Sequence, residues 1–191
     1  ESIAQLEISA NDFTNMFQSI NLIVPASFVR RGTMIEGNEI NVTRRMVLNS
    51  NIGSSQIVIG SGQNIEVFNN KFSSSADAPP LIDLGNAAFM QSAINIDNAS
   101  FSIVRDNIIE GFEVGIYIRQ AGNINNRRMK VNDNKIKSNY YGIFLDSELN
   151  QANTNPSVNT YIQCNEIEMD LENNATSVGI AVHFNADIAS A

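Results

Sequence analysis

The side chains that could carry nucleophilic or metal chemistry are few and lie far apart. The chain of 191 residues has one histidine, His183, and one cysteine, Cys164. A Ser-His-Asp or Cys-His site would depend on His183 alone, and one His with one Cys is too few for a zinc site of the usual kind. We expect Cys164 to be a buried structural thiol at an inward corner of the fold, where it would be inert.

Carboxylates that act as an acid–base pair must face each other across a site. Asp97 and Asp146 follow predicted strands but stand two repeats apart, and Asp106 and Asp133 stack at a predicted corner, where turn geometry explains them. The acidic tract at 166–172 lacks the ligand spacing of a calcium loop. We therefore predict no catalytic residue, no metal site and no cofactor.

The composition excludes some classes of partner. Hydrophobic residues make up 43% of the chain, which suits a globular core, and the formal net charge is −8. A surface with this charge repels phosphate backbones, so we expect no nucleic-acid partner. The longest early apolar run, INLIVPASFV, is interrupted by Pro25 and is too short to span a membrane.

Asparagine is unusually frequent, with 28 residues, and six of these asparagines belong to a repeated string. Each string has an aliphatic residue, two mostly small or polar residues, Asn, any residue, and then Ile or Phe. The strings are ISANDF, IEGNEI, VFNNKF, VRDNII, VNDNKI and IQCNEI, and their asparagines are Asn11, Asn38, Asn70, Asn107, Asn134 and Asn165.

A second element follows the first at a fixed distance. Ile109 precedes Ile116 of VGIYI by the same seven residues that separate Ile136 from Ile143 of YGIFL. Both elements alternate with period two over three to five residues, which indicates strands, and no stretch has the spacing of an amphipathic helix. Short strands that recur without helices predict an all-β, right-handed parallel β-helix of about six coils.

Stacking of the coils explains the repeated asparagines. Equivalent residues of successive coils lie above one another, and an amide has both a donor and an acceptor, so identical side chains can bond to each other in a ladder. An aspartate at the same place would repel its copy. The residue before each Asn is small or turn-forming, as a corner requires. We interpret the six asparagines as structural.

The pattern N-x-[IF] followed by G-I-x-[IVL] resembles the repeats of the pectate-lyase-like superfamily, and within it the NosD and carbohydrate-binding/sugar-hydrolase (CASH) repeats. The resemblance extends from about Leu6 to Phe184. It implies a parallel β-helix, but such coils carry lyases, hydrolases, epimerases, phage tailspikes and inert surface modules. The Gly-His-Gly, Arg-x-Lys and Asp-Pro-His strings of the enzymes are absent from this sequence.

We expect one domain over residues 1–191, with the variation in length confined to loop inserts at 50–56, 73–80, 119–128, 150–159 and 172–177. A solenoid needs caps on its terminal coils, and no amphipathic helix precedes or follows the strands. The chain is therefore expected to be a fragment of a larger protein or a subunit whose ends are capped by neighbouring protein.

A stripe on the outward side of the Gly-Ile strands is the candidate binding surface. If Ile116 and Ile118 point inward, Tyr117 points outward, and so does Phe144 in the next coil. Exposed aromatic rings beside polar side chains would form a sugar-stacking platform, whereas an insert such as 150–159 could instead fold over them. The polar members of the stripe are Asn95, Arg119, Asp146 and His183.

These observations predict a non-catalytic β-helix module of a bacterial secreted or cell-surface protein. It would be a rigid scaffold and binding surface for polysaccharide or a protein partner. Two alternatives remain: a polysaccharide lyase or glycoside hydrolase with a non-standard site, and a segment of a phage tailspike or fibre, which would be trimeric.

Overall fold

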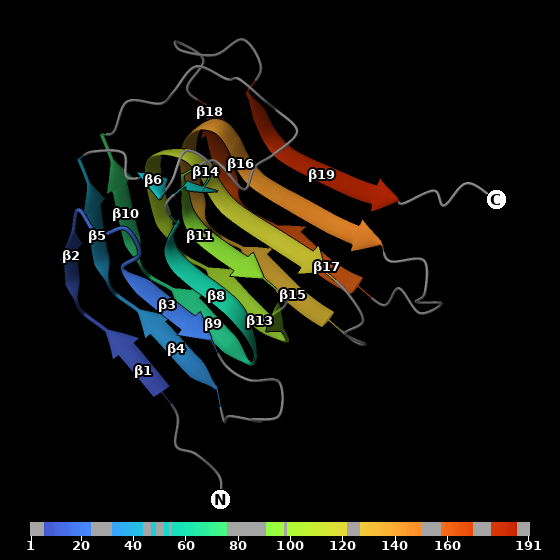
Figure 1. The fold of residues 1–191 in the computed structure, drawn as a ribbon, viewed down its shortest axis with the longest axis horizontal. Coiled ribbons are helices and arrows are strands. Elements are labelled where there is room, and N and C mark those ends of the chain that lie inside the picture. The colour runs from blue at the N-terminus through green and yellow to red at the C-terminus, as the bar shows by residue number, and fades with distance from the viewer. Residues whose placement is uncertain are drawn as a thin grey trace, which may run out of the picture.

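The computed structural model describes residues 6–23, 32–43, 47–48, 52–53, 55–75, 91–97, 99–121, 127–149, 158–169 and 177–186. Every regular element in these ranges is a β-strand, and nearly all strand pairs are parallel (Figure 1). The search of the described residues for a helix able to span a membrane found none. The expected all-β class is confirmed.

One sheet contains six parallel strands, each of which pairs with the strand of the next repeat. Their order in the sheet is β1-β4-β9-β13-β15-β17. One aliphatic residue of each strand lies in register with the next, from Ile8 at one edge to Ile162 at the other. The strands are β1 (Leu6–Ser9), β4 (Thr33–Glu36), β9 (Ile65–Phe68), β13 (Ser102–Arg105), β15 (Arg127–Asn132) and β17 (Val158–Gln163).

The second sheet contains 11 strands and is strongly curled, because its longest strands bend over one end of the molecule (Figure 1). A separate antiparallel pair joins β6 (Val47–Leu48) and β7 (Ile52–Gly53). The strands of the curled sheet are β2 (Asp12–Thr14), β3 (Ile20–Ile23), β5 (Glu39–Val42), β8 (Ser55–Gln63), β10 (Lys71–Ser74), β11 (Ser92–Asp97), β12 (Ala99–Ser100), β14 (Ile108–Ala121), β16 (Lys135–Leu149), β18 (Glu166–Met169) and β19 (Val178–Ala186).

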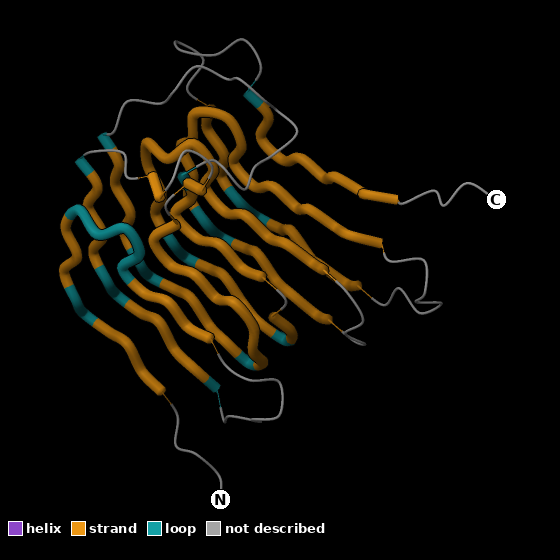
Figure 2. Tube along the Cα trace, in the orientation of Figure 1, coloured by secondary structure: helices purple, strands orange, loops and turns teal. Residues whose placement is uncertain are grey.

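Some strands are longer than the sequence pattern predicted. Strand β14 has 14 residues and β16 has 15, because the two short elements of a repeat join into one bent strand (Figure 2). The pairing of β14 with β16 shifts register on either side of Phe112, as in a β-bulge. Gly111 lies at this bend with φ +76, and an added Cβ would overlap the backbone oxygen of Ser74.

The core lies between the two sheets and is filled by in-register rows of aliphatic side chains. One row consists of Ile20, Ile57, Ile94, Ile116 and Ile143, all of which are buried. The predicted spacing is therefore confirmed, since the first element contributes Ile109 and Ile136 to the same core. Stacked parallel strands around one apolar interior are compatible with a parallel β-helix.

Candidate functional site

The six repeated asparagines lie at one corner, between the strands of the six-stranded sheet, called the flat sheet from here on, and those of the curled sheet. The side-chain Nδ2 of each donates to the Oδ1 of the Asn in the next repeat at 2.9–3.1 Å, from Asn11 through to Asn165. The backbone N–H of each donates to the same oxygen at 3.0–3.1 Å. Each Oδ1 from Asn38 to Asn165 thus accepts two hydrogen bonds, both from the Asn of the preceding repeat.

The amides also bind the backbone of the strand before the corner. Asn107 Nδ2 donates to the carbonyl oxygens of Val67 and Arg105 at 3.0 and 2.9 Å, in addition to Asn134 Oδ1. The four inner members of the ladder are 0–1% exposed. Buried amides with this many partners stabilise the corner, and their bonding capacity is largely used within the protein.

The residue before each Asn adopts a left-handed backbone, as the corner requires. Values of φ run from 52° at Ala10 to 62° at Gly37, and Cys164 has φ 53°. The expectation that Cys164 is buried is wrong, because its side chain is exposed. The physical reason is that a left-handed residue at this corner directs its Cβ away from the core, which the neighbouring Asn side chain occupies.

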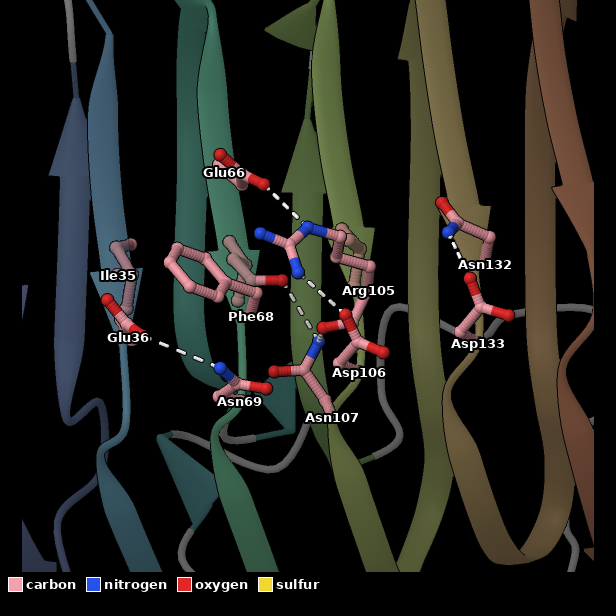
Figure 3. Close-up of polar contacts among 12 residues, drawn as sticks. Ile35, Glu36, Glu66, Phe68, Asn69, Arg105, Asp106, Asn107, Asn132 and Asp133 are labelled. Carbon is pink, nitrogen blue, oxygen red and sulfur yellow. Dashed lines mark hydrogen bonds and ion pairs between the residues drawn. The ribbon is translucent and has the colours of Figure 1, made fainter.

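A charged cluster on the outer face of the six-stranded sheet centres on Arg105 (Figure 3). Its Nε donates to Glu66 Oε1 and its Nη1 to Asp106 Oδ2, both at 2.6 Å. The guanidinium also lies 4.3 Å from the centre of the Phe68 ring. The hydrogen bond to Asp106 and the nearby Glu66 raise the pKa of Arg105. This arrangement ties β9 to β13 and covers Phe68.

The two corner aspartates have local hydrogen-bond partners. Asp106 accepts from Arg105, and Asp133 Oδ2 accepts from Asn132 Nδ2 at 2.5 Å (Figure 3). Within the described ranges, no group of three or more His, Cys, Asp or Glu side chains could hold a metal ion. These contacts agree with the interpretation of Asp106 and Asp133 as turn residues.

The outward stripe predicted from the Gly-Ile strands has the expected register. Asn95, Tyr117, Phe144 and Ala181 lie side by side on β11, β14, β16 and β19. The two rings are in contact, with centres 5.7 Å apart. They are not exposed: Tyr117 and Phe144 are each 5% exposed and belong to a second apolar cluster with Val114, Tyr140 and Tyr141.

The expectation of an open stacking platform is therefore wrong for these two rings. Their outward direction was inferred from the alternation along the strand, but alternation says nothing about what covers the outer face. The proposed covering insert at 150–159 lies outside the described residues except for its last two positions.

A charged row runs beside the aromatic one. Asp97, Arg119, Asp146 and His183 follow one another in register on β11, β14, β16 and β19. The first three side chains are partly exposed, and the side chain of His183 lies outside the description. The row therefore alternates acid and base, and it places Arg119 between two carboxylates.

Tyr117 links the two rows. Its hydroxyl donates to Asp146 Oδ2 at 3.1 Å. Burial, with a further contribution from Asp146, raises the pKa of Tyr117 well above its ordinary value of 10.0. Tyr117 is thus a hydrogen-bond donor at every physiological pH, and it orients one oxygen of Asp146.

One carboxylate that the sequence pattern did not predict as a site residue is buried. Glu113 is 2% exposed on β14, and its Oε2 accepts the backbone N–H of Gln91 at 2.8 Å. The signal was present, since an acidic residue stands between Phe112 and Val114 in the apolar run GFEVGIYI. Because a strand normally alternates, the bulge beside Phe112 is what turns Glu113 into the protein.

Comparison of the chain with protein-family models, with curated proteins and with solved structures found no match in any of the three.

Proposed function

We propose that this chain is a non-catalytic parallel β-solenoid module, a rigid scaffold that presents a binding surface outside a bacterial cell. Each of its six coils would contain one strand of the flat sheet and the strands of the curled sheet that follow. The observation that carries the proposal is the asparagine ladder, whose five amide-to-amide bonds link six successive repeats from Asn11 to Asn165. A continuous buried network of this kind opposes bending between coils.

The binding surface in this proposal is the row Asp97, Arg119 and Asp146, and its ligand is a polysaccharide. Neighbouring side chains in the row are about 4.8 Å apart, the spacing of adjacent strands. Carboxylates accept hydrogen bonds from sugar hydroxyls, and a guanidinium donates to sugar oxygens. Tyr117 supports the site by orienting Asp146. Since the rings are buried, recognition depends on hydrogen bonds rather than on ring stacking.

Binding to a panel of neutral and acidic polysaccharides, measured by glycan array and affinity electrophoresis, tests this surface. Arg119→Ala and Asp146→Asn should each weaken binding at least about tenfold, which corresponds to roughly 1.4 kcal/mol. Lys137→Ala is the matched control, because Lys137 lies on the same strand and pairs with Glu168 away from the row. A wild-type protein that binds no glycan would remove polysaccharide from the proposal and leave a protein partner.

A glycoside hydrolase is the second candidate, and one observation favours it. Asp97 and Asp146 lie two strands apart on one row, so their backbone positions are separated by about 9.6 Å, twice the spacing between strands. That is close to the upper end of the carboxylate separation of roughly 6.5–9.5 Å in inverting hydrolases.

Incubation with the same panel separates the two candidates. A hydrolase would release new reducing ends, and Asp97→Asn would abolish the release, whereas a lyase would form unsaturated products. A binding module would do neither while still retaining the glycan.

A further inference from the structure

The two ends of the stack differ in how well their inward-facing side chains are covered. We call β1, β2 and β3 the N-terminal edge and β17, β18 and β19 the C-terminal edge. On β19, Val178, Ile180 and Val182 are 39, 47 and 48% exposed. Of their neighbours one strand further in, Tyr141 is 6% exposed and Ile143 is 0% exposed, whereas Leu145, the neighbour of Val182, is partly exposed. The C-terminal edge therefore presents a row of exposed aliphatic side chains, and no strand of the described residues pairs with the outer side of β19.

The asparagine ladder has a direction, and at each end one group has no hydrogen-bond partner among the described residues. Every backbone N–H of the ladder asparagines from Asn11 to Asn134 donates toward the C-terminal edge. No described residue accepts the backbone N–H of Asn165, the last member. At the other end, Asn11 donates to Asn38, and no described residue donates to Asn11 Oδ1. Within the described ranges, the C-terminal edge thus has a donor without a partner, and the N-terminal edge has the matching acceptor without a partner.

We infer that the C-terminal edge binds the N-terminal edge of a second copy of this chain, head to tail. Continuing the observed register places the two edges in contact through chemically matched rows. Asn165 N–H would donate to Asn11 Oδ1 of the second copy, as in each step within the chain. The apolar pairs in such a contact are Ile162 with Ile8, Ile167 with Phe13, Ile180 with Ile20, and Val182 with Leu22.

Two features make this association weak. The same register places Asp12 of the second copy over Glu166, and like charges repel. In addition, Ile20 and Leu22 are only 6 and 8% exposed, so they gain little further burial. Residues of opposite charge form ion pairs along the register row that contains Asp12 and Glu166. Lys135 pairs with Glu166 at 3.4 Å, and Lys71 pairs with Glu39 at 3.5 Å. Replacing Asp12 by a cation should therefore strengthen the contact.

A head-to-tail contact uses two different surfaces and does not close, so copies add in a line. Sedimentation velocity over a concentration series should show a mean mass that rises beyond a dimer. Ile180→Lys should abolish the rise, because a lysine on an open edge opposes pairing. Ile103→Lys is the control, since Ile103 is partly exposed in the middle of the flat sheet. Thermal unfolding checks that both variants are folded.

Asp12→Lys decides the direction of the contact even if Ile180→Lys fails to fold. It replaces a repulsion with an attraction across the junction and should lower the dissociation constant about tenfold. A tail-to-tail dimer, in which two C-terminal edges pair, would be unaffected by Asp12→Lys and would overturn the inference. A wild-type chain that stays monomeric at the highest attainable concentration would also overturn it.

Discussion

The asparagine corner, formed by the six ladder residues, and the glycine row, formed by Gly115, Gly142 and Gly179, both repeat one residue type on neighbouring strands. At the corner the side chain is essential, because each amide bonds to the next at 2.9–3.1 Å. At Gly115 and Gly142 in the glycine row, the absence of a side chain is essential. A Cβ on Gly142 would lie 2.5 Å from Gly179 O and 2.5 Å from Ile167 Cγ2.

The difference shows that repetition has two opposite structural causes. An Asn recurs where stacked backbones turn and leave polar groups that an amide can satisfy. Gly115 and Gly142 stand where a neighbouring strand approaches so closely that no side chain fits. Neither cause involves a ligand, so a repeated residue in this fold is weak evidence for a site. The functional candidates are the residues that vary along a row, such as Asp97, Arg119 and Asp146.

The largest expected effect comes from the middle of the corner. Asn107→Ala should lower the free energy of unfolding by about 4 kcal/mol, since it leaves several buried donors and acceptors without partners at about 1–3 kcal/mol each. Asn11→Ala should cost only about 1 kcal/mol, because Asn11 is exposed at the end of the ladder. Urea unfolding followed by circular dichroism measures both. Equal costs would contradict a cooperative ladder.

The next largest effect is expected in the glycine row. Gly142→Ala should destabilise the protein by about 3 kcal/mol, because backbone and Ile167 must move to admit the methyl group. Gly179→Ala is the matched control, since the nearest atom to its added Cβ is Ile167 Cγ2 at 3.8 Å. We expect this control to cost less than about 1 kcal/mol. An unchanged stability of Gly142→Ala would show that lack of space for a side chain is not the reason for a glycine at this position.

A smaller effect tests the left-handed position of the corner. Cys164→Gly should raise the stability by about 0.5 kcal/mol, because removal of the left-handed strain slightly outweighs the extra entropy of glycine. Cys164→Ala keeps the strain and removes the thiol, so it should leave the stability unchanged. Thermal unfolding under reducing conditions compares the three proteins. A gain in the alanine variant would assign the effect to the thiol instead.

The smallest effect is expected at Ser138, which lies next to Gly115 of the glycine row. Ser138 is fully buried, and its Oγ has no hydrogen-bond partner among the described residues. Ser138→Ala removes an unsatisfied group and changes little volume, so the stability should stay the same or rise by less than about 0.5 kcal/mol. Chemical denaturation measures the change. A loss of more than about 1 kcal/mol would mean that the hydroxyl has a structural role.

Part of this structure could be predicted from the sequence because local spacing and local geometry determine it. The interval between Ile109 and Ile116, repeated at Ile136 and Ile143, predicted which side chains share the core. The sequence predicts an insert at 50–56, but Ser55 and Gln56 begin strand β8 (Ser55–Gln63), because these polar side chains are buried in the fold. The bulge at Gly111 also had no clear local signal.

The candidate site was less predictable than the fold. The order Asp97, Arg119, Asp146 follows from register, and register follows from the repeated aliphatic residues. The exposure of Tyr117 and Phe144 does not follow from register, because the area of a side chain that remains in contact with water depends on segments distant in sequence. The exposure of Cys164 was missed for a related reason, since the direction of a Cβ at a left-handed corner depends on how the corner packs.

The sequence by itself determined the strand class, the period of the repeat and the positions of the six asparagines, because these depend on alternation and on the backbone preferences of single residues. Only the tertiary structure decided which outward side chains are covered, that the carboxylate of Glu113 is buried, and which edge keeps exposed aliphatic residues. These properties depend on the packing of strands that are 27–37 residues apart in the chain, and short-range patterns do not determine that packing.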